Sequence, residues 1–95
     1  MDVSRHIGSL LILGFPGPVL GQEMEISRDI VDFNLGGVIL FNRCLHTPAQ
    51  PANIISPTQL KELCSSLQKL ADTTLLIGVD QEGGKVRRLR PEAGF

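Results

Sequence analysis

A short apolar run that stops at two carboxylates is the feature that most constrains the fold of this chain. Residues 75–79 read Leu-Leu-Ile-Gly-Val, and Asp80, Gln81 and Glu82 follow them directly. The run is too short for an isolated helix and has the length of a strand that is buried on both faces. Such strands are typical of parallel α/β sheets, in which ligands bind at the carboxyl ends of the strands. The pattern therefore predicts a ligand site at Asp80.

Two further apolar runs predict strands earlier in the chain. Residues 10–15 read Leu-Leu-Ile-Leu-Gly-Phe and end at a Pro-Gly-Pro turn, and residues 37–41 read Gly-Val-Ile-Leu-Phe. Both runs are bounded by turn-forming residues, so we expect buried strands here and over 74–79.

Two segments between these runs carry apolar residues at helical spacing. The first predicts a helix over 22–35, which Asn34 and the glycines after it would end in a left-handed cap. The second predicts a helix that begins with Ser56 as its N-cap and Pro57 in its first turn. Residues 42–55 form a long polar loop before this helix, and loops of that length are usually functional or disordered.

The order strand, helix, strand, helix, strand predicts parallel strands that are joined by right-handed crossovers. Three parallel strands leave two apolar edges open, which invites aggregation unless further strands cover them. We therefore expect residues 1–95 to be the front of a larger α/β domain, or a truncated copy of one.

Composition argues against several classes of function. The net charge of −1 and the absence of Trp and Tyr argue against a nucleic-acid partner, and no apolar run approaches the ~18 residues of a membrane span. Glycines interrupt the apolar stretch over 7–15 and no cleavage site follows it, so we expect a cytoplasmic protein without a signal peptide. Cys44 and Cys64 lack metal-ligand spacing and are expected to be reduced thiols, with Cys64 packed in a core. Neither a metal nor another cofactor is predicted.

Asp80 and Glu82 are the first candidates for chemistry. Side chains at i and i+2 of a strand share a face, so the two carboxylates could form a general acid/base pair. Two carboxylates on one strand cannot easily flank opposite sides of a scissile bond, however. In one alternative, Asp80 caps the turn at the strand end and Glu82 pairs with Arg87 or Arg88. The interpretation that we favour has Asp80 orient a ligand while Glu82 is structural.

The residues after Glu82 are glycines and cations. Gly83 and Gly84 allow a ligand to approach the backbone, but the chain holds no phosphate-loop motif, so a nucleotide site is not expected. Four of the nine basic residues lie within six positions, namely Lys85, Arg87, Arg88 and Arg90. One of these arginines, turned into the site, would offer forked donors to hydroxyls or carboxylates. Asn42 and Arg43 after the 37–41 run are either ligand contacts or a plain turn.

The segment from Asp80 to Arg88 has the pattern Asp-Gln-Glu-Gly-Gly-Lys-Val-x-Arg, and further motifs lie in residues 7–15, 36–43 and 53–60. In this order the four motifs resemble the family 3 glycoside hydrolases, and most of all their bacterial β-N-acetylhexosaminidase branch. Lys85 departs from the arginine that is usual at its position. The loop over 45–52 is longer than in the shortest members of the family.

The resemblance implies a fold, a reaction and a role for each matched site residue. It implies an α/β fold, the front portion of a (β/α)8 TIM barrel with about three strands and two helices, because such barrels need about 250 residues. It implies retaining hydrolysis of β-glycosides through a covalent intermediate on an aspartate. That nucleophile and the histidine acid/base lie downstream in the family, so no catalytic residue is expected in this chain. Asp80 and Arg88 match residues that bind the sugar.

The resemblance thus predicts the N-terminal part of a β-N-acetylhexosaminidase that acts on amino-sugar glycosides, plausibly of cell-wall origin, and that is inactive as an isolated chain. Two alternatives remain at this point. One is a β-glucosidase or β-xylosidase of the same family. The other is a non-catalytic sugar-binding protein or a truncated product. For the hydrolases and for the sugar-binding protein alike, the expected partner is a carbohydrate.

Overall fold

A computed structural model describes residues 3–21, 23–43, 52–83 and 86–95. Within these residues the elements follow one another as helices, strands and a final 3-10 turn. They are α1 (Val3–Gly8), β1 (Ile12–Leu13), α2 (Glu25–Phe33), β2 (Gly37–Leu40), α3 (Pro57–Leu70), β3 (Leu76–Val79), β4 (Gln81–Gly83), β5 (Val86–Arg87) and η1 (Pro91–Ala93).

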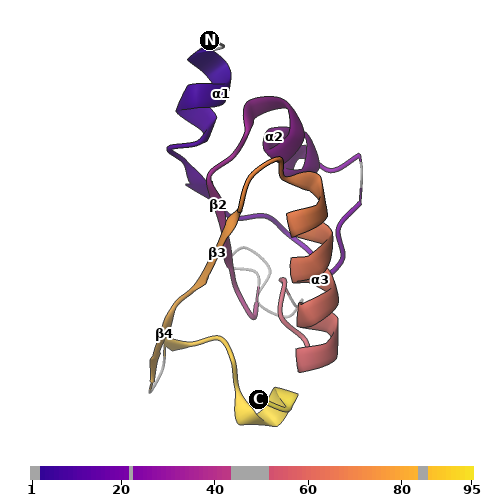
Figure 1. Ribbon diagram of the computed structural model, residues 1–95. Helices are drawn as coiled ribbons and strands as arrows, with labels where there is room; N and C mark the ends of the chain where they lie inside the picture. Colours follow the sequence, from indigo (N-terminus) through magenta and orange to yellow (C-terminus); the bar gives the residue numbers. More distant parts are fainter. Residues whose placement is uncertain (1–2, 22, 44–51, 84–85) are drawn as a thin grey trace.

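Strands β1, β2 and β3 form one parallel sheet in that order. Ile12 of β1 pairs with Gly37 of β2, which pairs with Leu76 of β3, and β2 and β3 stay in register up to Leu40 and Val79. The predicted parallel arrangement of the three strands is therefore confirmed. Figure 1 shows α2 and α3 on the same side of β2 and β3, whereas the hairpin of β4 and β5 lies beyond the carboxyl end of β3.

The core lies between one face of the sheet and these two helices. Val38 and Leu40 of β2 are buried against apolar side chains of α2 and α3, with Val38 and Leu67 fully excluded from solvent. Cys64 packs against the same cluster as a free thiol, as predicted, and its partial burial raises its pKa. Cys44 lies outside the described residues. No helix in the described part of the chain is long and apolar enough to cross a membrane.

Helix α3 begins as its sequence predicts. Ser56 has an extended backbone and its hydroxyl accepts a hydrogen bond from the Gln59 N–H at 3.2 Å, with Pro57 at the first helical position. The Gln59 side chain returns the contact, because its Oε1 accepts from the backbone N–H groups of Ile55 (2.8 Å) and Ser56 (3.4 Å). This reciprocal capping box satisfies donors that the first helical turn leaves unpaired.

We expect Ser56→Ala to lower the free energy of unfolding by about 1 kcal/mol, because the Gln59 N–H loses its acceptor. Urea unfolding followed by circular dichroism measures the difference. Ser65→Ala, at an exposed position of the same helix, should leave stability unchanged or raise it slightly, because alanine is the better helix former. Equal stability of Ser56→Ala and the parent chain would contradict the role of the cap.

The end of α2 is explained only in part by the predicted cap. Asn34 adopts the left-handed conformation, with φ 54°, as expected. Gly36 and Gly37 do not have positive φ values and serve a different purpose, since a Cβ on Gly36 would overlap the backbone carbonyl of Ser9. These glycines let the start of β2 pass close to neighbouring segments of the same chain, Gly36 to the residues before β1 and Gly37 to Leu76 of β3.

The expectation that the strands are buried on both faces is wrong. On the face away from α2 and α3, Ile12 is 58% exposed and Leu76 is 63% exposed, with Gly37 in register between them. Conversely, part of the predicted polar loop is buried, because Ala52, Asn53 and Ile54 lie in the interior. Residues 44–51 of that loop lie outside the described residues.

The predicted front portion of a (β/α)8 TIM barrel is also wrong for this chain. The described residues form a small mixed α/β domain with an open sheet of three parallel strands, and the strand pair that follows is antiparallel and belongs to a separate sheet. A barrel would instead continue its parallel order after β3. Helix α1 and the hairpin of β4 and β5 were not predicted, because short elements carry little periodicity.

Candidate functional site

Asp80 and Arg88 flank the paired strands β4 and β5 at the same end of the hairpin. Asp80 follows the last residue of β3, and Gln81 of β4 pairs with Arg87 of β5 in an antiparallel register. Continuing that register by one residue places Asp80 opposite Arg88, and opposite residues in antiparallel strands have Cβ atoms about 4.5–5.5 Å apart. No ion pair joins the two within the described part of the chain. Their polar groups remain available to a ligand.

The side chain of Gln81 holds Arg88 in this place. Its Oε1 accepts hydrogen bonds from the backbone N–H groups of Arg88 (2.9 Å) and Leu89 (3.1 Å), and its Nε2 donates to the Leu89 carbonyl at 3.2 Å. Leu89 in turn packs against the hydrophobic core. An amide that binds two N–H groups and one carbonyl replaces ladder hydrogen bonds where the strands are too short to supply them.

Phe41 completes the cluster from the neighbouring strand. Because Leu40 pairs with Val79 in a parallel register, the next residues along each strand, Phe41 and Asp80, lie side by side. The guanidinium carbon of Arg88 lies 5.2 Å from the centroid of the Phe41 ring, within the range of a cation–π contact. The Arg88 guanidinium and the Phe41 ring thus meet beyond the end of β2, and Asp80 follows the end of the neighbouring strand β3.

Three buried polar atoms near these strand ends lack a hydrogen-bond partner among the described residues. They are Asn42 Oδ1, Arg87 Nε and Arg88 Nε. Leaving a buried polar atom unpaired costs about 1–3 kcal/mol, so each of these atoms needs a partner such as a water molecule or a ligand. The set contains two donors and one acceptor. Arg87 and Arg88 are consecutive residues, and successive side chains of a strand point to opposite faces, so the two donors do not face one site.

A buried asparagine fixes the backbone beneath the site. Asn53 is fully excluded from solvent, and its Oδ1 accepts from the Phe41 N–H at 3.0 Å. Its Nδ2 donates to the carbonyls of Phe15 and Gly17, both at 2.9 Å. The Phe41 carbonyl accepts from the backbone N–H groups of Asn53 (2.9 Å) and Ile54 (3.2 Å). Asn53 therefore ties the end of β2 to the segment that follows β1.

Sequence reasoning missed the role of Asn53. A polar residue between the apolar Ala52 and Ile54, just before a helix cap, was the available signal. The capping residue Gln59 extends the same network, because its Nε2 donates to the carbonyls of Asn53 and Pro18, both at 2.7 Å.

The predicted acid/base pair gains no support from the geometry. Glu82 is exposed, and a bulge between Gln81 and Gly83 interrupts the regular alternation that would place it on the same face as Asp80. Glu82 also forms no ion pair with Arg87 or Arg88 within the described residues. Those residues contain no group of three or more metal-ligating side chains. Gly84 and Lys85 lie outside them.

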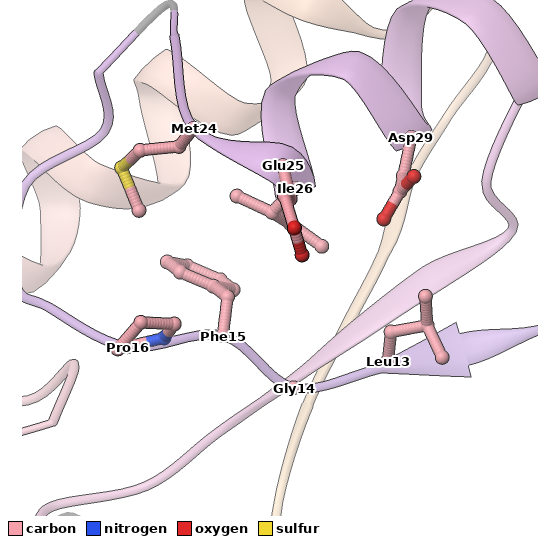
Figure 2. Close-up of a pocket in the computed structure, with 8 residues that line it drawn as sticks. All are labelled: Leu13, Gly14, Phe15, Pro16, Met24, Glu25, Ile26 and Asp29. Atoms are coloured by element: carbon pink, nitrogen blue, oxygen red, sulfur yellow. The ribbon is translucent and has the colours of Figure 1, made fainter.

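A separate cavity of about 380 Å³ lies between the end of β1 and the start of α2. Figure 2 shows the carboxylates of Glu25 and Asp29 pointing from α2 towards the segment that carries Leu13 and Phe15, with Ile26 beside Glu25 on the helix. The two carboxylates lie one helical turn apart and repel each other. They provide acceptors without cationic donors, so the cavity is a weaker candidate for a sugar than the cluster around Asp80.

Relatives with established names share most of this chain. It is 42% identical over 82 residues to a β-hexosaminidase of Nitrosomonas eutropha, which covers 84% of the chain and 20% of that protein. It is 44% identical over 74 residues to the β-hexosaminidase of Thiobacillus denitrificans, with 76% and 18% covered. These proteins are homologues of the chain. The chain spans about a fifth of their length. No family model matches the sequence.

Solved structures give a consistent context. A glycoside hydrolase family 3 β-N-acetylglucosaminidase from Paenibacillus sp. str. FPU-7 superposes with a TM-score of 0.77 at 30% identity, over 95% of this chain and 16% of that one. A fungal multi-domain β-N-acetylglucosaminidase of the same family reaches 0.78 at 35% identity, over 99% of this chain and 10% of that one. It is described by its GCN5-related glucosamine N-acetyltransferase region and not by a barrel. That description agrees with the small α/β domain and, with the open sheet, overturns the barrel expectation.

Proposed function

We propose that the chain belongs to the family 3 glycoside hydrolases and contributes the sugar-holding part of a β-N-acetylhexosaminidase. The names of its homologues and structural neighbours support this context, and both refer to proteins several times longer than the chain. Asp80 accepts hydrogen bonds from sugar hydroxyls, and Arg88 donates to the same sugar. The observation that supports the proposal is the pairing of Gln81 with Arg87, from which we infer that the flanking residues Asp80 and Arg88 lie opposite each other beyond the end of β3.

The chemistry of the cluster fits a neutral amino sugar. A carboxylate and a guanidinium together carry no net charge, and both form charge-assisted hydrogen bonds to hydroxyls. The acetamido group of an N-acetylhexosamine adds one carbonyl acceptor and one N–H donor, which are complementary to the unpaired Arg88 Nε–H and Asn42 Oδ1. In this proposal the chain binds the sugar, and hydrolysis requires residues that the homologues carry outside the matched segment.

We expect N-acetylglucosamine to bind the 95-residue chain saturably, and Asp80→Ala to weaken binding about tenfold or more, because hydrogen bonds to a charged acceptor are among the stronger ones. Titration followed by amide chemical shifts measures both values. Asp32→Ala removes an exposed carboxylate at the other end of the domain and should leave the Kd unchanged.

Glucose and xylose serve as comparison ligands in the same titration. Tighter binding of N-acetylglucosamine than of either sugar would support the amino-sugar assignment, and the reverse order would favour a glucosidase or xylosidase. No saturable shift with any of the three would refute the sugar site. Turnover of an aryl N-acetyl-β-glucosaminide by the chain would contradict the assignment of Asp80 as a binding residue rather than a nucleophile.

A further inference from the structure

Arg88 is held by an aromatic ring instead of a carboxylate. Its guanidinium carbon lies 5.2 Å from the centre of the Phe41 ring. The structure shows no ion pair and no side-chain hydrogen bond for this guanidinium within the described residues, and its Nε is both buried and unpaired. The ring is therefore the contact that defines where the cation lies.

The arrangement has a chemical consequence. A guanidinium that pairs with a carboxylate uses two of its donors in that pair, whereas a cation–π contact with a ring consumes no N–H group, so the four N–H groups on the two terminal nitrogens of Arg88 keep their hydrogen-bonding capacity. The cation–π contact also restricts the Arg88 side chain before a ligand arrives, which reduces the conformational entropy that this side chain loses on binding. The Phe41 ring thus fixes the position of the Arg88 guanidinium without using any of its hydrogen-bond donors.

The ring can do this only if its own backbone is fixed. The Phe41 N–H donates to Asn53 Oδ1, and the Phe41 carbonyl accepts from two backbone N–H groups, so three hydrogen bonds hold this residue. Gln81 fixes the backbone of Arg88 from the other side. The two residues are thus held independently, one by the β2 end and one by the hairpin, and their side chains meet.

We propose that Phe41 is a positioning residue whose ring holds the Arg88 guanidinium beside Asp80, ready to donate to a sugar. The inference rests on the proposed function, since it assigns a cause to the geometry of that site. Nothing in the sequence motif distinguishes Phe41 from a core residue, but it is only partly buried and lies at the end of its strand.

The test compares Phe41→Leu, which removes the ring, with Phe41→Tyr, which keeps it. We expect Phe41→Leu to weaken N-acetylglucosamine binding about three- to fivefold, as the loss of a partly exposed cation–π contact implies, and Phe41→Tyr to stay within about twofold of the parent chain. In an Arg88→Ala background, Phe41→Leu should have no further effect. Amide spectra and urea unfolding confirm that each variant is folded.

Equal weakening by Phe41→Leu and Phe41→Tyr would overturn the proposal, as would an undiminished effect of Phe41→Leu in the Arg88→Ala background. A second measurement needs no ligand. The side-chain Nε–H resonance of Arg88 in the free chain should carry a ring-current shift that Phe41→Leu abolishes and Phe41→Tyr retains. If the parent chain binds no sugar, the proposed function fails, and this resonance still decides whether Phe41 positions Arg88.

Discussion

Replacing Asn53 with alanine should destabilise the chain by about 3 kcal/mol, because three hydrogen bonds to buried or partly buried backbone groups disappear together. The Phe41 N–H loses its acceptor, and the carbonyls of Phe15 and Gly17 lose their donor. Domains of this size are stable by only about 5–15 kcal/mol, so the loss is a large part of the total. The midpoint of urea unfolding measures it.

A matched control is available on the surface. The side-chain amide of Gln68 likewise binds the backbone of another residue. Its Nε2 donates to the Leu75 carbonyl at 2.7 Å, and its Oε1 accepts from the Leu75 N–H at 3.1 Å. Gln68 is exposed, so water replaces these bonds in Gln68→Ala, and we expect about 1 kcal/mol or less. Similar losses for the two variants would show that burial does not give Asn53 its importance.

The sequence signals that succeeded are local ones. Helix α3 was predicted with its cap because Ser56, Pro57 and the apolar spacing that follows all act within one or two turns of the helix. The parallel order of β1, β2 and β3 followed from the alternation of strands and helices. The position of Asp80 directly after β3 followed from the apolar run of that strand, which ends immediately before this residue. None of these inferences needs knowledge of distant contacts.

The contacts that build the candidate site depend on residues far apart in the sequence. Asp80 and Arg88 flank a hairpin whose strands have three and two residues, too short for a periodic pattern. Phe41 meets Arg88 across 47 positions of sequence (88 − 41), and no motif predicts that pair. Asn53 is polar, so hydropathy places it in a loop, whereas the backbone groups around it satisfy its amide in the interior.

Burial was the property that sequence predicted least well. An apolar run shows that a strand can be covered, but what covers each face depends on the packing of other elements. Leu75 is buried against the helices, whereas the next residue, Leu76, points to the open face of the sheet. The incorrect barrel expectation has another origin, since it came from the family resemblance, and no single strand encodes how many strands its sheet contains.

Gly36→Ala should also cost about 3 kcal/mol of stability, for a reason unrelated to backbone conformation. The new methyl group would overlap the Ser9 carbonyl, a backbone group that cannot rotate away, so the chain before β1 would have to separate from β2. That movement weakens the bonds from the Gly36 N–H to the Gly8 carbonyl (3.0 Å) and from the Gly37 N–H to the Leu11 carbonyl (3.1 Å). Urea unfolding again provides the measurement.

Gly78→Ala is the matched control in the adjacent strand. A Cβ at Gly78 meets nothing closer than the Val38 carbonyl at 3.9 Å, which is ordinary contact, and the residue is exposed on the open face of the sheet. Because glycine within a strand is less stable than alanine by about 0.5–1 kcal/mol, Gly78→Ala should leave stability unchanged or raise it slightly. If Gly36→Ala proved equally harmless, the close passage of β2 beside Ser9 could not be what requires glycine at position 36.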